Sequence, residues 1–239
     1  MSYKGIVFDK DGTLIDFNST WLPVYRYAAL EMANNDRLLA EELLNQHGYD
    51  ADSSRFLGGS LLAAGNNHEI AHAWARLLPD VDDEKKIESM SVRLNQIFHQ
   101  QVALSATPVQ GLKTTLRHLT GAGLKLGVAT SDSYQGIQNS LQAFDVISEF
   151  EFLCGYDSGH GVKPGAGMVL AFCNAMSLDP ADVIVVGDNR HDIEMGKNAR
   201  AGFCVGVLTG TSTRAELEVL ADVVFEDITD LVQLISVQA

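Results

Sequence analysis

The sequence is poor in basic residues. Its 239 residues include 17 lysines and arginines against 31 aspartates and glutamates, which gives a formal net charge of −14. Phosphate backbones and anionic membranes attract basic surfaces, so this balance argues against nucleic acid and membrane surfaces as partners. An acidic chain can still bind a small phosphorylated molecule if a metal ion and a lysine reverse the field locally.

Cysteine and long apolar runs are also scarce. Cys154, Cys173 and Cys204 form no Cys-x-x-Cys pair, and each lies in or beside an apolar segment. We therefore expect reduced, packed thiols in a cytoplasmic protein. No run reaches the roughly 18 consecutive apolar residues that a membrane helix needs. The first residues show no long apolar stretch, so we expect no secretory signal.

Short apolar runs alternate with helical patterns over most of the chain. Runs of this length, almost without polar residues, are typical of strands covered on both faces of a parallel sheet. The apolar runs lie at 5–8, 124–129, 183–186 and 203–208, weaker strand patterns at 151–154 and 222–225, and helical patterns at 113–122, 134–144, 167–176 and 192–201. This alternation predicts an α/β fold with a doubly wound parallel sheet, resembling a Rossmann fold.

Residues 18–107 have a different pattern. Asn18 or Ser19 can cap a helix, residues 67–78 favour a second helix that stops at Pro79, and residues 87–98 lie within a longer one. No convincing strand occurs in this stretch. The sequence therefore predicts a catalytic core made of residues 1–17 and 108–239 and an all-helical inserted domain at 18–107.

Polar residues follow the apolar runs at the points where the strands should end. Ligands of open parallel sheets bind outside the carboxyl ends of the strands, so we expect these residues to converge. They are Asp9 and Asp11 after the first run, Thr130 and Ser131 after the second, and Asp188 after the third, with Asp192 four residues further on. Lys163 lies in a glycine-rich loop before the helical pattern at 167–176.

These residue types suit phosphoryl transfer. Carboxylates such as Asp9 and Asp188 can hold Mg²⁺, which prefers oxygen ligands. The ion and Lys163 would neutralise phosphate charge, so that Asp9 can attack phosphorus and form an aspartyl-phosphate. Asp11 can protonate the leaving oxygen and then activate water, while Thr130 donates a hydrogen bond to a phosphoryl oxygen.

Four segments in the right order resemble the motifs of the haloacid dehalogenase superfamily, on its phosphatase side. They are DKDGT at 9–13, VAT at 128–130, Lys163-Pro164, and VGDNRHD at 186–192. The insertion lies where this family places a helical cap of the C1 type. The chain as a whole is similar to phosphoglycolate-phosphatase-like members.

The resemblance assigns roles to the residues of these motifs. It implies that Asp9 is the nucleophile and Asp11 the acid/base, with Lys163 steadying the nucleophile and the phosphoryl group. Thr130 is the phosphate-binding hydroxyl, and Ser131 is a neighbouring candidate for that contact. The metal ligands are Asp9, the main-chain carbonyl of Asp11, and Asp188, with Asp192 acting through water.

The sequence departs from the family pattern at two positions. The family often shows Lys-Pro-x-Pro at the third motif, and here Ala166 replaces the second proline. Lys10 stands where relatives commonly have an apolar residue, and we expect it to point away from the nucleophile and to act on flap or surface electrostatics.

The predicted function is Mg²⁺-dependent hydrolysis of a small phosphorylated metabolite, with phosphoglycolate as the first candidate. A phosphomutase of the same fold, resembling β-phosphoglucomutase, is an alternative. A phospho-accepting, receiver-like signalling domain is a weaker one, since receivers are shorter and lack the second acid of the Asp9-x-Asp11 pair. The sequence does not indicate the oligomeric state.

One histidine pair stands outside these motifs. His68 and His72 are four residues apart and would share a helix face. Two such histidines can bind zinc, but the sequence shows no third ligand. We therefore expect them to be solvated or packed.

Overall fold

The computed structural model describes residues 3–81 and 83–236. Its contacts divide the chain into two compact units, Met1–Asp16 with Pro108–Ala239, and Phe17–Thr107. The sequence places this boundary one residue later. Phe17 groups with the second unit because its ring centroid lies 5.7 Å from that of Phe56 and 6.1 Å from that of Trp21.

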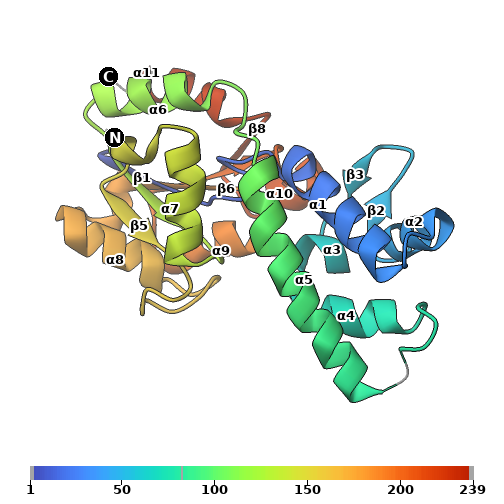
Figure 1. The fold of residues 1–239 in the computed structure, drawn as a ribbon. Helices are drawn as coiled ribbons and strands as arrows, with labels where there is room; N and C mark the ends of the chain where they lie inside the picture. Colours follow the sequence, from blue (N-terminus) through green and yellow to red (C-terminus); the bar gives the residue numbers. More distant parts are fainter. Residues whose placement is uncertain (1–2, 82, 237–239) are drawn as a thin grey trace. The chain divides into compact units, whose positions relative to one another are not determined.

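A six-stranded sheet forms the centre of the first unit (Figure 1). All its strand pairs are parallel, in the order β5-β4-β1-β6-β7-β8. The strands are β1 (Gly5–Phe8), β4 (Lys125–Ala129), β5 (Phe152–Cys154), β6 (Val183–Gly187), β7 (Phe203–Val207) and β8 (Val223–Phe225). The helices that follow or precede them are α6 (Leu112–Gly121), α7 (Tyr134–Ala143), α8 (Gly167–Met176), α9 (Arg190–Asn198), α10 (Arg214–Glu218) and α11 (Leu231–Ser236). The predicted doubly wound α/β fold is confirmed.

Both faces of this sheet are covered, which explains why its strands are apolar at every position except Lys125, the exposed first residue of β4. Side chains alternate between the faces along β1: Ile6 and Phe8 join a core cluster with residues of α6, α7 and α11. Val7 joins a second cluster with residues of α8 and α9 on the opposite face. Figure 1 shows α6 and α11 on one side of the sheet and α8 on the other.

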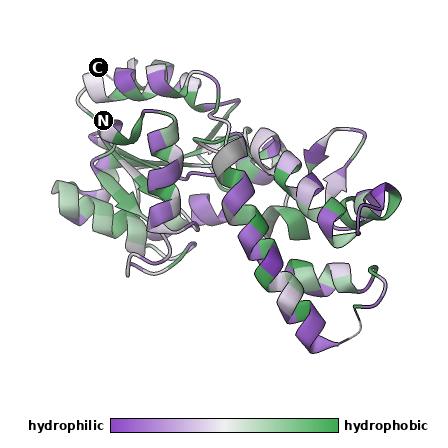
Figure 2. Ribbon diagram, viewed as in Figure 1, coloured by the Kyte–Doolittle hydropathy of each residue, from purple (hydrophilic) through white to green (hydrophobic). Residues whose placement is uncertain are grey.

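The second unit is mostly helical and has a core of its own. Its helices are α1 (Phe17–Met32), α2 (Arg37–Asn45), α3 (Leu61–Ala64), α4 (Asn67–Ala75) and α5 (Glu84–Ser105). Hydrophilic and hydrophobic stretches alternate along α5 (Figure 2), as expected for a helix with one buried face. Buried Leu94 and Ile97 lie on that face.

The prediction of an all-helical insertion needs one correction. Strands β2 (Tyr49–Asp50) and β3 (Arg55–Phe56) pair antiparallel within this unit. Each is only two residues long, so no alternation can be read from the sequence. The turn between them is stabilised locally, because the Asp50 carboxylate accepts hydrogen bonds from the backbone amides of Asp52 and Ser53.

The three cysteines are free and buried in the first unit, as the sequence predicts. Cys154, Cys173 and Cys204 belong to the same core cluster beneath the sheet. Burial raises the pKa of Cys173 and of Cys204 to about 11. Burial keeps reagents away from the thiols, and the raised pKa lowers the fraction of thiolate, which is the reactive form.

We therefore expect the native protein to resist thiol reagents. A chromogenic disulfide reagent at neutral pH should titrate none of the three thiols within minutes in the folded protein and all three after denaturation. Rapid modification of a thiol in the folded protein would contradict the packing described here.

Candidate active site

Asp9, Thr130 and Asp188 lie just beyond the ends of three adjacent strands. The register pairs Phe8 of β1 with Val128 of β4 and with Val186 of β6, so these strands end at one edge of the sheet. The Asp9 amide continues the ladder by donating to the Val186 carbonyl at 2.8 Å. All three polar residues are buried. The edge therefore carries buried polar groups that the surrounding apolar core does not explain.

Lys163 joins two acids at this edge. Its Nζ lies 2.5 Å from Asp9 Oδ1 and 2.6 Å from Asp192 Oδ1, and its side chain is 4% exposed. Burial alone lowers the pKa of Lys163, but the carboxylates of Asp192 and Asp9 outweigh burial and raise it above the usual value. The lysine therefore remains an ammonium group that fixes both carboxylates.

Asp192 is held from two sides. It is fully buried in the first turn of α9, where its Oδ2 accepts a hydrogen bond of 3.1 Å from the Asn189 amide. This bond is half of a capping box, in which the Asn189 side chain caps the helix in return. Its other oxygen contacts Lys163. The start of α9 thus determines where the lysine is anchored.

Three carboxylates at this edge could share a cation. One oxygen each from Asp9, Asp188 and Asp192 lie within 4.8 Å of one another. Burial, opposed by Lys163 and reinforced by Asp192, raises the pKa of Asp9 to about 6. Burial, and then the charges of Asp192 and Asp9, raise the pKa of Asp188 well above its usual value. A divalent cation would relieve this repulsion, and an all-oxygen donor set fits a hard ion such as Mg²⁺.

Asp188 is oriented by the loop that follows β7. The Thr211 amide donates a hydrogen bond of 3.0 Å to Asp188 Oδ2. Gly210 makes this approach possible, because a Cβ on it would come within 1.8 Å of the same oxygen. In the same loop, the Thr209 hydroxyl donates to the Gly12 carbonyl at 2.6 Å. Neither threonine is predicted from the sequence, although both follow the apolar run at 203–208, just as Asp9 follows the run at 5–8.

The loop after β1 carries Asp11 beside the acid cluster. Its tight turn depends on Gly12, which has a φ of +88° and whose added Cβ would fall 2.7 Å from Asp188 Oδ2. Asp11 Oδ1 and Thr13 Oγ1 are buried and have no hydrogen-bond partner among residues 3–81 and 83–236. Buried polar atoms are normally paired, so these two oxygens are available to a ligand.

Lys10 is not at the surface, so the expectation that it acts on surface electrostatics is wrong. Its side chain is 1% exposed, with Nζ 2.7 Å from Asp11 Oδ2 and 3.0 Å from Asp132 Oδ2. Burial lowers the pKa of Lys10, but Asp11 and Asp132 raise it above the usual value. Lys10 is therefore a second buried ammonium group, and it holds one oxygen of Asp11 while the other stays free.

Thr130 and Ser131 differ in their surroundings. Thr130 is buried, its amide donates to the Cys154 carbonyl at 3.0 Å, and its hydroxyl accepts from the Asp132 amide at 3.2 Å. That contact leaves the hydroxyl proton free to be donated. Ser131 is exposed. Of the two, Thr130 is the residue that the fold fixes in place.

Comparisons with known proteins agree with this arrangement. The sequence profile of the haloacid dehalogenase-like hydrolases matches residues 6–205, which include every motif described above. The chain belongs to this family. The resemblance inferred from the motifs is thereby confirmed, as is the prediction of an enzyme of this hydrolase family.

Relatives match the hydrolase over nearly its whole length. It is 27% identical over 236 residues to "Pyrophosphatase PpaX" of Listeria welshimeri, covering 96% of this chain and 95% of the relative. It is 29% identical over 243 residues to "Phosphoglycolate phosphatase" of Shigella boydii, covering 95% and 90%. The solved structure of a subfamily IA hydrolase of the superfamily from Geobacter sulfurreducens superposes with a TM-score of 0.72 at 18% identity, covering 98% and 96%. The last comparison supports the fold alone.

The described part of the hydrolase contains no helix that is both long enough and apolar enough to cross a membrane.

Replacing Lys10 by methionine tests its buried ion pairs. The variant keeps most of the side-chain volume but leaves Asp11 and Asp132 without their cation. We expect the free energy of unfolding to fall by about 3 kcal/mol, as when one partner of a buried ion pair is removed. Urea denaturation measures this change.

Lys125 provides the matched control. It pairs with Glu151 at 2.8 Å on the surface, so Lys125→Met should cost less than about 1 kcal/mol. Equal losses of unfolding free energy in the two variants would show that the ion pairs of Lys10 stabilise the fold no more than a solvent-exposed pair does.

Proposed function

We propose that this hydrolase cleaves the phosphate ester of a small phosphorylated metabolite through a covalent intermediate on Asp9. The observation that supports this most directly is the contact of Lys163 with both Asp9 and Asp192 beside Asp188. A buried ammonium group next to three acids lets an anionic nucleophile approach an anionic ester.

In the first step, an oxygen of Asp9 forms a bond to phosphorus while the bond from phosphorus to the ester oxygen breaks. Asp11 gives its proton to the departing oxygen, using the Oδ1 atom that Lys10 leaves free. Lys163 keeps Asp9 oriented and offsets charge on the phosphoryl oxygens. Thr130 donates its hydroxyl proton to one of them.

In the second step, Asp11 takes a proton from a water molecule that attacks phosphorus. The bond between phosphorus and Asp9 breaks, phosphate leaves, and Asp11 is again protonated. Asp9, Asp188 and the Asp11 carbonyl would hold Mg²⁺, with Asp192 acting through water. The ion supplies charge neutralisation of the phosphoryl group.

Ser131 remains a second candidate for the phosphate contact, because it directly follows Thr130 in the chain. We further propose that residues 18–107 form a cap. The chain leaves the sheet unit six residues after Asp11, at Phe17, and returns to it at Pro108. Closure of such a cap would exclude water from the reacting ester.

If the cap closes, Mg²⁺ together with a phosphate analogue should reduce the radius of gyration measured by solution scattering. An unchanged radius, together with unchanged turnover after rigidifying residues 16–19 and 105–109, would contradict cap closure.

Substitution of Asp9 tests the nucleophile. Asp9→Asn should lower kcat by about 10³-fold or more, as loss of the nucleophile does in other covalent enzymes. Asp145→Asn is the matched control, since Asp145 is an exposed partner of Lys113 and belongs to none of the motifs. Turnover of Asp9→Asn near that of the control would refute the assignment.

Asp11→Asn separates the two steps. With an activated aryl phosphate, whose leaving group needs no proton, this variant should accumulate phosphoprotein, because the water attack lacks its base. Mass spectrometry of a quenched reaction should find the added phosphate on Asp9. Phosphate on another residue would contradict the mechanism.

A phosphate-release screen tests the substrate class and the metal. Phosphoglycolate, pyrophosphate, sugar phosphates and nucleotides should be compared, and chelation should abolish release until Mg²⁺ is restored. Phosphoglycolate and pyrophosphate come first because relatives carry those names. Isomerised sugar phosphate without free phosphate would support a phosphomutase instead, and a single labelling event per chain would support a receiver-like domain.

A further inference from the structure

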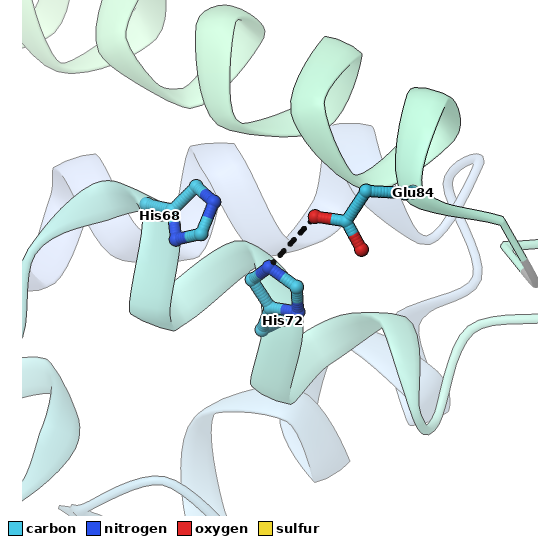
Figure 3. A group of neighbouring side chains, drawn as sticks. All are labelled: His68, His72 and Glu84. Carbon is cyan, nitrogen blue, oxygen red and sulfur yellow. Dashed lines mark ion pairs between the residues drawn. The ribbon is translucent and has the colours of Figure 1, made fainter.

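A second group of metal-binding side chains lies on the helical unit, outside the acid cluster. His68 and His72 come from α4, and Glu84 comes from the first turn of α5. Figure 3 shows both imidazole rings on the side of α4 that faces Glu84. One ligand atom from each of the three residues lies within 4.8 Å of the others. The third ligand that the sequence does not show is therefore supplied by the neighbouring helix.

The pairing across the two helices is regular. His72 Nε2 lies 3.3 Å from Glu84 Oε1, and His68 Nε2 lies 3.8 Å from Glu88 Oε2. The two histidines are four residues apart on one helix, and the two glutamates are four residues apart on the other. Residues at this spacing occupy one helix face, so two imidazoles face two carboxylates. The histidine ring centroids are 4.5 Å apart.

The helix packing holds these side chains in position. Ile70 and Trp74 of α4 and Leu94 of α5 are buried in the core of the helical unit. The Asn67 side chain donates to that of Asn95, which links α4 to α5 near one end of the contact. The backbone positions of the two helices are therefore fixed without help from the histidines, and the ligands need only side-chain rotation to converge.

We propose that His68, His72 and Glu84 bind a divalent transition-metal ion, Zn²⁺ by preference, with Glu88 or water as the fourth ligand. Zinc takes imidazole nitrogen and carboxylate oxygen at about 2.0–2.2 Å in a tetrahedron, which places neighbouring ligand atoms about 3.3 Å apart. The His72–Glu84 pair already has this spacing. The remaining separations, up to 4.8 Å, close within the rotation of exposed side chains.

Ligand chemistry separates this site from the acid cluster of the sheet unit. Asp9, Asp188 and Asp192 offer only oxygen and suit a hard ion, whereas two imidazoles favour zinc over magnesium. Exposure also differs: His68 is 54% exposed, His72 35% and Glu84 73%. The site is thus open to solvent, its metal exchanges, and a bound ion would link α4 to α5.

The test uses the full chain, stripped with a chelator and then held in excess Mg²⁺ to occupy the acid cluster. Calorimetric titration with Zn²⁺ should detect one ion per chain. His68→Gln and His72→Gln should each weaken this binding at least tenfold, and Glu84→Gln should weaken it several-fold. None of these side chains is buried, so the variants should fold, which circular dichroism checks. His118→Gln, at an exposed position on α6, is the matched control.

Two further measurements locate the ion. Asp188→Asn should retain the binding event if the ion lies between α4 and α5, and lose it if zinc enters the acid cluster. Co²⁺ should give the visible absorption of a four-coordinate nitrogen-containing site in the native chain and not in the double histidine variant. Equal zinc binding by the native chain and the double variant would overturn the proposal, as would absence of zinc binding to the native chain.

Discussion

The contact between one buried ammonium group and two carboxylates organises the sheet edge. Lys163 contacts Asp9 and Asp192, and Asp188 lies close enough to both acids to complete a cluster of three carboxylates. Burial raises the pKa of Asp9 and of Asp188, so their ionised forms are disfavoured in isolation. The cluster is therefore electrostatically incomplete. The uncompensated negative charge of the carboxylates is the physical reason to propose a further cation beside them, and with that cation an anionic substrate.

The parallel sheet stabilises the fold enough to tolerate such a cluster of buried charges. Its strands bury both faces, and the apolar core supplies the stability that a group of buried charges does not. The charged residues lie only where strands have ended and backbone amides become available, as with the Thr211 amide at Asp188 and the Asn189 amide at Asp192. The stabilising residues and the site residues are thus neighbours in the chain: each strand contributes buried apolar side chains, and the loop after it contributes polar groups.

The sequence predicts well whatever depends on neighbours along the chain. The apolar runs identify the strands because both sheet faces are buried, and the residues after those runs identify Asp9, Thr130 and Asp188. The position of the Lys10 side chain cannot be predicted in this way. Alternation of side chains holds only within a strand, and the chain turns directly after Phe8, where the amides of Leu14 and Ile15 both donate to the Lys10 carbonyl. The direction of the Lys10 side chain is therefore set by the turn and cannot be read from periodicity.

Contacts between elements distant in the chain are the other part that the sequence leaves open. Thr211 reaches Asp188 only because β7 pairs with β6, and Glu84 reaches His72 only because α5 packs against α4. In the sequence alone, neither Thr211 nor Glu84 stands out from other threonines and glutamates. Once the packing is known, however, equal four-residue spacings on two facing helices acquire a chemical meaning. Donor type then distinguishes the two proposed cation sites: buried oxygen ligands alone beside the sheet, and imidazole nitrogen with carboxylate oxygen between two helices.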